Sequence, residues 1–180
     1  MVLWVGIALG LAVGLGVAAK HKVRYEAPVF RHLWLVPIAF LLQWWEQSND
    51  YPIIASQLIF LAFAFFNRNH KGMLILFMGA ALNLLVMSAN GGRMPISPET
   101  ASRLFPKENL WDFPAGTLIG PKDILLPPED TRFVWFADRF LPPIWLPYQF
   151  AFSLGDVFIA AGAFWLLAKP TPFAKGEQPQ

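Results

Sequence analysis

Five long apolar stretches constrain the fold of this chain more than any other feature. Each holds few or no charged residues and is close to the ~20 residues that a helix needs to cross about 30 Å of hydrocarbon. Backbone groups inside lipid must pair within their own segment, so we expect helices. The stretches cover residues 2–18, 28–45, 51–66, 72–89 and 148–168. The sequence therefore predicts an all-α integral membrane protein with five transmembrane helices in one domain, residues 1–180.

The composition agrees with a membrane location. Apolar residues make up 56% of the chain and charged residues 14%, against roughly 45–50% and about 25% in soluble domains. A small soluble domain leaves too much surface exposed to bury so many apolar side chains. The net charge of +2 excludes a nucleic-acid partner bound by bulk charge. The absence of cysteine from the sequence excludes thiolate metal sites.

The distribution of Lys and Arg predicts the orientation. Basic residues follow the first, third and fifth stretches, whereas Glu46 and Asp50 follow the second. Cytoplasmic loops carry an excess of Lys and Arg, so we expect a multi-pass protein of the bacterial cytoplasmic membrane, with the N-terminus outside and the C-terminus inside. The alternative is a cleaved signal peptide ending near Val17-Ala18-Ala19, but no basic residue precedes this apolar run.

The segment 90–147 is expected outside the membrane, and the tail 170–180 is expected to be disordered. Proline is concentrated in the outer segment and excludes long helices there. One short helix is expected to begin with Ser97 as N-cap and Pro98 as first helical residue, and a second is expected after Pro128. Two interpretations stay open: an interfacial cap on the bundle, or a docking surface whose contacts are Trp111, Trp135 and Trp145.

Glycines in the first stretch indicate a close helix contact. Gly6, Gly10 and Gly14 stand four residues apart on one helix face, a spacing that allows another helix to approach closely. The partner helix belongs either to this bundle or to another subunit.

Polar residues within the stretches predict an intramembrane cluster. Asp156 is expected about two turns inside the last stretch, where a carboxylate costs roughly 2.5–3.5 kcal/mol and requires a partner. Asn83 is expected at the same depth, and the rest of the cluster is Ser153, Gln43 and Gln57. The cluster is either interhelical hydrogen bonding or a proton or substrate site.

A turn of Asn90, Gly91, Gly92 and Arg93 is expected to end the fourth stretch, because glycine readily adopts positive φ. Arg93 is expected either to turn back toward Asp156 or to bind lipid phosphate.

Motifs for catalysis are absent from the sequence. No histidine lies in the middle of a stretch, and no His/Asp/Glu cluster has metal-ligand spacing, so no metal or cofactor is expected. Nucleophile-elbow, P-loop and dinucleotide-binding patterns are also absent. The sequence predicts a protein that is not an enzyme.

Three motifs resemble one family. They are the run from Asn83 through Asn90-Gly91-Gly92-Arg93-Met94-Pro95 to Glu99, then Glu129-Asp130-Thr131, then Ser153-Leu154-Gly155-Asp156-Val157. They resemble an uncharacterised bacterial membrane-protein family, domain of unknown function 5317. The resemblance implies a small multi-span membrane protein and assigns no activity.

These observations together favour an accessory or assembly subunit of a larger bacterial membrane complex. Its expected partners are membrane lipid and other membrane-protein subunits, and not nucleic acid. The alternative is a small transporter or proton-coupled carrier that uses the Asp156 cluster. A carrier requires a water-accessible cavity at Asp156, whereas a subunit requires broad dry contacts.

Overall fold

The chain is mostly helical and carries a small sheet. The computed structural model describes residues 1–44 and 51–169, and the predicted disordered tail, 170–180, lies outside the described residues. The longer helices are α1 (Val2–His21), α2 (Leu35–Trp44), α3 (Tyr51–Phe66), α4 (Met73–Ala89) and α6 (Leu154–Leu167). Between α4 and α6 lie α5 (Pro98–Leu104), the 3₁₀ turns η1 (Leu110–Asp112) and η2 (Val134–Phe136), and strands β1 (Met94–Ile96), β2 (Leu118–Ile119) and β3 (Asp123–Leu125).

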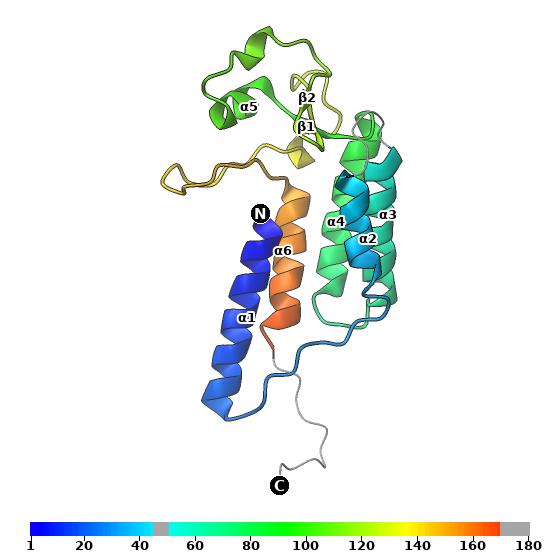
Figure 1. Cartoon of the computed structure of the whole chain (residues 1–180), viewed down its shortest axis with the longest axis vertical. Coiled ribbons are helices and arrows are strands. Elements are labelled where there is room, and N and C mark those ends of the chain that lie inside the picture. Colours follow the sequence, from blue (N-terminus) through cyan, green and yellow to red (C-terminus); the bar gives the residue numbers. More distant parts are fainter. Residues whose placement is uncertain (45–50, 170–180) are drawn as a thin grey trace.

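The five longer helices pack side by side in a bent row, in which α2 overlaps α4 and α3 in the view of Figure 1. The segment between α4 and α6 lies over the helix ends on one side, and an end of the row means here one such set of helix ends. We call residues 90–153 the cap. The order along the row is α1, α6, α4, α3, α2. Helix α6 therefore separates α1 from the other three longer helices.

The sheet of the cap has the order β1-β3-β2. β1 pairs parallel with β3, with Pro95 opposite Ile124, and β2 pairs antiparallel with β3. A small apolar core lies beside this sheet and consists of Ile96, Ala101, Leu110 and Leu125. A second core joins the cap to α3 and α4 and consists of Ile53, Val86, Met87, Met94 and Ala137.

The glycine face of α1 packs against α6. A Cβ atom at Gly6 would collide with the backbone oxygen of Ala160, and one at Gly14 would collide with that of Leu167. Gly10 meets the backbone of Phe164 in the same way. Contact this close lets van der Waals packing hold two apolar helices together without polar groups. The structure thus places Gly6, Gly10 and Gly14 inside the bundle.

A second glycine contact joins α4 to α6, and the sequence analysis missed it. Gly79 lies against the backbone of Gly155, and Gly72 lies against that of Gly162. Gly72 and Gly79 are seven residues apart in the sequence, and so are Gly155 and Gly162. Seven residues make about two helical turns, so the glycine contact repeats along the two antiparallel helices. The signal was present in the sequence as matching seven-residue spacings in two distant segments.

The prediction of five transmembrane helices is wrong. Within the described residues, α1 is the one helix long and apolar enough to span a membrane. Helices α3, α4 and α6 are apolar but contain 16, 17 and 14 residues, and α2 contains 10. At 1.5 Å per residue, 14 residues extend only about 21 Å, short of the ~30 Å hydrocarbon layer. The all-α assignment is also wrong, because the cap contains the three-stranded sheet.

Two apolar stretches become helical later than predicted. Residues 28–34 precede α2 without forming a helix, and His32 in this segment has a φ of 54°. In the last stretch, Phe152 forms an antiparallel bridge with Phe140, so α6 begins only after Ser153. Hydrophobicity marked both stretches correctly as apolar but carried no information on backbone pairing.

The cap contains one of its two predicted helices. The start of α5 is confirmed: the Ser97 side chain accepts a hydrogen bond from the Thr100 backbone N–H, and Pro98 is the first helical residue. The helix expected after Pro128 is wrong, because the structure has only the single turn η2 there. Phe133, which precedes η2, has a φ of 57° and breaks any longer helix.

Candidate functional site

Asn83, Ser153 and Asp156 form a hydrogen-bonded triad where α4 meets the start of α6. Asn83 Nδ2 donates to Asp156 Oδ1 (3.0 Å), and Ser153 Oγ donates to Asn83 Oδ1 (2.8 Å). Ser153 and Asn83 are buried, at 0% and 6% exposure. Gly155 makes the contact possible, because a Cβ atom there would collide with Asn83 Oδ1. The structure therefore joins three of the five polar residues that the sequence analysis grouped.

Asp156 lies in the first turn of α6, and its expected position two turns inside a span is wrong. Ser153 Oγ accepts a hydrogen bond from the Asp156 backbone N–H (3.1 Å), and Asp156 Oδ2 accepts one from the Ser153 backbone N–H (3.2 Å). This reciprocal pair is a capping box, which satisfies backbone donors at a helix start. Both carboxylate oxygens of Asp156 thus accept hydrogen bonds from the protein itself.

The two glutamines of the predicted cluster lie on other helices. Gln43 Nε2 donates to Ser56 Oγ (3.2 Å), which links α2 to α3. Gln57 lies half-buried on α3. The prediction that Gln43 joins the Asp156 group is therefore not met, because the cap end of α6 neighbours α4 and not α2.

Asn90 fastens the cap to the end of α4. Its Nδ2 donates to the backbone oxygens of Val86 (2.7 Å) and Arg132 (2.9 Å), and its Oδ1 accepts from the Arg132 backbone N–H (2.9 Å). The chain then turns through Gly91 and Gly92, whose φ values are 76° and 90°. The helix stop predicted at these glycines is confirmed, because α4 ends at Ala89.

Arg93 is buried, with 3% exposure. Its Nη1 donates to the backbone oxygen of Pro121 (2.8 Å), and so links the residue before β1 to the turn before β3. The buried position removes the guanidinium from any lipid surface, so the expectation of a lipid-phosphate contact is wrong.

A charged group that the sequence analysis missed lies in the same region of the cap. Lys122 Nζ lies 3.2 Å from Asp138 Oδ2 and 3.7 Å from Asp123 Oδ1. Asp138 is 1% exposed, and within the described part of the chain its Oδ1 has no hydrogen-bond partner. Sheet pairing creates this group, because Asp123 begins β3 and Asp138 bridges to Ile96 of β1. The adjacent Lys122-Asp123 pair before an apolar run was a weak sequence signal.

Burial changes the protonation of this group. Burial raises the pKa of Asp138 to about 7, although Lys122 opposes the shift, and the carboxyls of Asp123 and Asp156 add to it. The pKa of Asp123 is also raised, mainly by burial. Burial lowers the pKa of Lys122, but Asp138, Asp123 and Asp156 outweigh this effect and hold it above its ordinary value. The group can therefore take up a proton at Asp138 near neutral pH.

The three predicted contact tryptophans are all exposed on the cap. Trp111, Trp135 and Trp145 are 65%, 71% and 78% exposed. Trp111 borders a hollow of about 220 Å³ that also includes Phe113. A larger hollow of about 410 Å³ is lined partly by Arg139, whose guanidinium lies 4.5 Å from the centre of the Trp135 ring. Asp156 lines neither hollow.

The chemistry available at the junction of bundle and cap is hydrogen bonding and proton uptake. Within residues 1–44 and 51–169, no three His, Asp or Glu side chains are arranged to hold a metal ion. The amide, hydroxyl and carboxylate of the Asn83 triad are turned toward one another. The junction therefore holds the cap in place on the helices.

Asn67 makes a matching contact at the other end of the row, which the sequence analysis also missed. Its Nδ2 donates to the backbone oxygens of Phe63 (2.8 Å) and Arg31 (2.9 Å), and its Oδ1 accepts from the Arg31 backbone N–H (2.7 Å). Asn67 is 2% exposed. It ties the connection between α1 and α2 to the turn between α3 and α4.

Comparison with known proteins identifies the family of this chain and gives no activity for that family. A family model described as "Family of unknown function (DUF5317)" matches residues 28–168. An uncharacterized protein of Thermotoga maritima is 31% identical over 164 residues, which cover 88% of this chain and 84% of that protein. The chain belongs to the DUF5317 family, as its motifs indicated. No solved structure matches the chain.

Proposed function

We propose that this protein is a non-enzymatic accessory or assembly subunit of a larger bacterial membrane complex. In this proposal the protein is anchored in the cytoplasmic membrane, and the cap outside it contacts another subunit through Trp111, Trp135 and Trp145.

The exposure of these three tryptophans carries the proposal. The cap has its own apolar core around Ile96 and Leu125, so it does not need the tryptophans to fold. Trp is enriched at the residues that contribute most to protein–protein binding, and an exposed Trp contributes little until a partner covers it. A cap held to the bundle by Asn90 and the Asn83 triad supplies a fixed base for such a contact.

Exposed apolar side chains on the helices support the membrane location. Trp4, Leu9 and Leu15 of α1 are 64%, 55% and 53% exposed, although α1 packs tightly on α6. A helix that is apolar all round belongs in a protein core or a membrane. We propose an orientation with the cap outside and the Lys/Arg-rich end in the cytoplasm, because Lys and Arg favour cytoplasmic loops.

The hydrogen bonding of Asp156 favours a subunit over a carrier. Asn83 and the Ser153 backbone N–H each donate to one of its oxygens. A carboxylate occupied in this way stabilises the helix start, whereas a carrier needs it open to water. We therefore do not adopt the proton-coupled carrier as a second function.

Mild detergent extraction tests the partner contact. The wild-type chain is expected to copurify with another membrane protein, and Trp135→Ala combined with Trp145→Ala is expected to lose it. Trp4→Ala is the matched control, because Trp4 is about as exposed but lies on α1. A monomer in the wild-type preparation, or equal loss in the control, would contradict the proposal.

Cysteine labelling of intact cells tests the location. A cysteine at Thr117 of the cap is expected to react with an impermeant thiol reagent added outside. A cysteine at Asn69, in the turn between α3 and α4, is expected to react only after lysis. The reverse pattern would contradict the orientation.

A further inference from the structure

We propose that the end of the row opposite the cap binds the phosphate headgroups of anionic phospholipids. The site is a basic platform made of Arg31, Arg68, Lys71 and Lys169. The proposal rests on the membrane location given above and goes beyond the contact made by the cap.

Asn67 builds one side of the platform. It holds the backbone of Arg31 through two hydrogen bonds, at 2.7 Å and 2.9 Å, across 36 residues of sequence. Arg68 is its immediate neighbour, so cations from two distant segments are fixed beside each other. The side chains of Arg31 and Arg68 stay exposed because Asn67 bonds only to backbone atoms.

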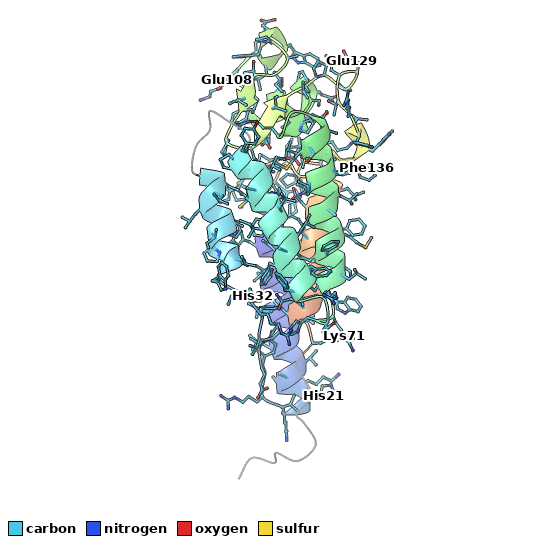
Figure 2. The ribbon with its side chains drawn as sticks, turned by 90° about the vertical axis from the view of Figure 1, so that its right-hand side faces the viewer. His21, His32, Lys71, Glu108, Glu129 and Phe136 are labelled. Carbon is cyan, nitrogen blue, oxygen red and sulfur yellow. The ribbon has the colours of Figure 1, made fainter. Side chains whose placement is uncertain are left out.

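Gly72 builds the other side. It has a φ of 92° and lies so close to the end of α6 that a Cβ atom would meet Gly162, Leu166 and Trp165. This contact brings Lys71 to the end of α6, where Lys169 is exposed. The turn between α3 and α4 thus gathers cations from three segments of the chain. Figure 2 shows Lys71 and His32 at this end of the row, with His21 farther out.

Aromatic rings support the cations of the platform. The Arg68 guanidinium lies 4.3 Å from the centre of the Phe65 ring, and Lys169 Nζ lies 5.2 Å from that of Trp165. Phe65 and Trp165 are themselves 51% and 45% exposed. A cation on an exposed ring suits the lipid interface, where the ring meets acyl chains and the cation meets phosphate.

The charge at this end has one sign. Residues 18–35, 66–73 and 165–169 together contain seven Lys and Arg residues and one acidic residue, Glu26. The cap is mixed, and Figure 2 shows Glu108 and Glu129 at its far end from the platform. A basic cluster beside apolar helices attracts anionic lipid by charge and holds it by acyl contact. Phosphatidylglycerol has a negatively charged headgroup, whereas the headgroup of phosphatidylcholine has no net charge.

Native mass spectrometry of the full chain in mild detergent tests the proposal. The chain is offered equal amounts of phosphatidylglycerol and phosphatidylcholine with identical acyl chains. Wild type is expected to retain phosphatidylglycerol in about tenfold excess. The triple variant Arg31→Gln, Arg68→Gln, Lys71→Gln is expected to lose this preference. Arg103→Gln, Lys107→Gln, Arg132→Gln is the matched control, because it removes two arginines and one lysine that are exposed on the cap and is expected to keep the preference.

Two further variants keep the test decisive if the triple variant does not fold. Lys71→Gln alone is expected to lower the preference about threefold, because each cation near a membrane surface adds to the attraction. Asn67→Ala keeps every charge but releases Arg31, and it is also expected to lower the preference.

Several results would overturn the proposal. Equal retention of both lipids by wild type, equal loss in the two triple variants, or displacement of phosphatidylglycerol by equimolar inorganic phosphate would each do so. The last result would assign the platform to free phosphate. Copurification of the partner subunit is measured in the same variants and is expected to be unchanged. A failure here is thus distinguishable from a failure of the cap contact.

Discussion

Asn67 and Asn90 make the same hydrogen bonds at opposite ends of the row, yet they fasten segments of different character. Each follows the last turn of a helix, donates to the backbone oxygen four residues earlier, and bonds to both backbone groups of a distant arginine. At Asn67 the arginine belongs to a surface of cations. At Asn90 it belongs to a cap that holds the half-exposed Lys122 against the buried carboxylate of Asp138. The same asparagine hydrogen-bonding pattern therefore joins distant segments at both ends, while the surrounding charges determine what each end binds.

The largest expected effect comes from placing a charge in either contact. In Asn67→Asp and Asn90→Asp, a carboxylate replaces an amide nitrogen that donates to two carbonyl oxygens. We expect each variant to lose about 3–5 kcal/mol of unfolding free energy, because the buried carboxylate has no cation to pair with among the described residues and one of its oxygens meets two carbonyl oxygens. Chemical denaturation in mild detergent measures this loss. Wild-type stability in one of the two variants would break the equivalence of the two ends.

Removing either amide is expected to cost less and to separate the two ends. In Asn67→Ala and Asn90→Ala, the backbone N–H and C=O of one arginine lose their hydrogen-bond partner. We expect each variant to lose about 2 kcal/mol of unfolding free energy. Limited proteolysis is expected to cut the connection between α1 and α2 in Asn67→Ala, and the cap near Arg132 in Asn90→Ala. Cleavage at one common site in both variants would show that the contacts act globally and not locally.

The pH dependence of stability is expected to distinguish the cap end. The folded chain binds a proton at Asp138 with a pKa of about 7, whereas the unfolded chain has released it near pH 4. Stability therefore falls as pH rises from about 4 to 8, and the part between pH 6 and 8 is about 1.4 kcal/mol. Asp138→Asn should remove this slope, and the exposed control Glu99→Gln should keep it. A slope that survives in Asp138→Asn would place the proton elsewhere.

The smallest effect is expected at the arginines themselves. Asn67 and Asn90 bond to the backbones of Arg31 and Arg132, and both side chains are exposed. Arg31→Ala and Arg132→Ala should each change the unfolding free energy by less than about 0.5 kcal/mol. A loss comparable to that of the asparagine variants would show that the side chain, and not the backbone, is what the amide holds.

The sequence predicted what depends on local chemistry. Ser97 and Pro98 mark the start of α5, and Gly91 and Gly92 mark the end of α4, because capping and positive φ are decided within a few residues. The residues Asn83 and Asp156 were grouped by depth, and the structure joins them by a hydrogen bond, although at a helix start and not inside a span.

What the sequence did not predict depends on contacts between distant segments. Asn67 is a single asparagine after an apolar helix, and nothing beside it indicates that it binds a backbone 36 residues away. The sheet was missed because its strands have two or three residues, too few for an alternating pattern. Lys122 and Asp138 meet only because that sheet forms. Hydropathy also predicted helices that are too long, because it ignores backbone pairing between distant segments such as that of Phe140 with Phe152.

The position of α6 between α1 and α4 also has a consequence for synthesis. The chain emerges from the ribosome N-terminus first, so α1 is complete long before Leu154–Leu167 exists. During this interval the groove of Gly6, Gly10 and Gly14 has nothing of its own chain to fill it except Tyr25. The row can close only after α6 has been synthesised. A chain interrupted before residue 154 would leave the glycine face of its first helix without the helix that it packs against.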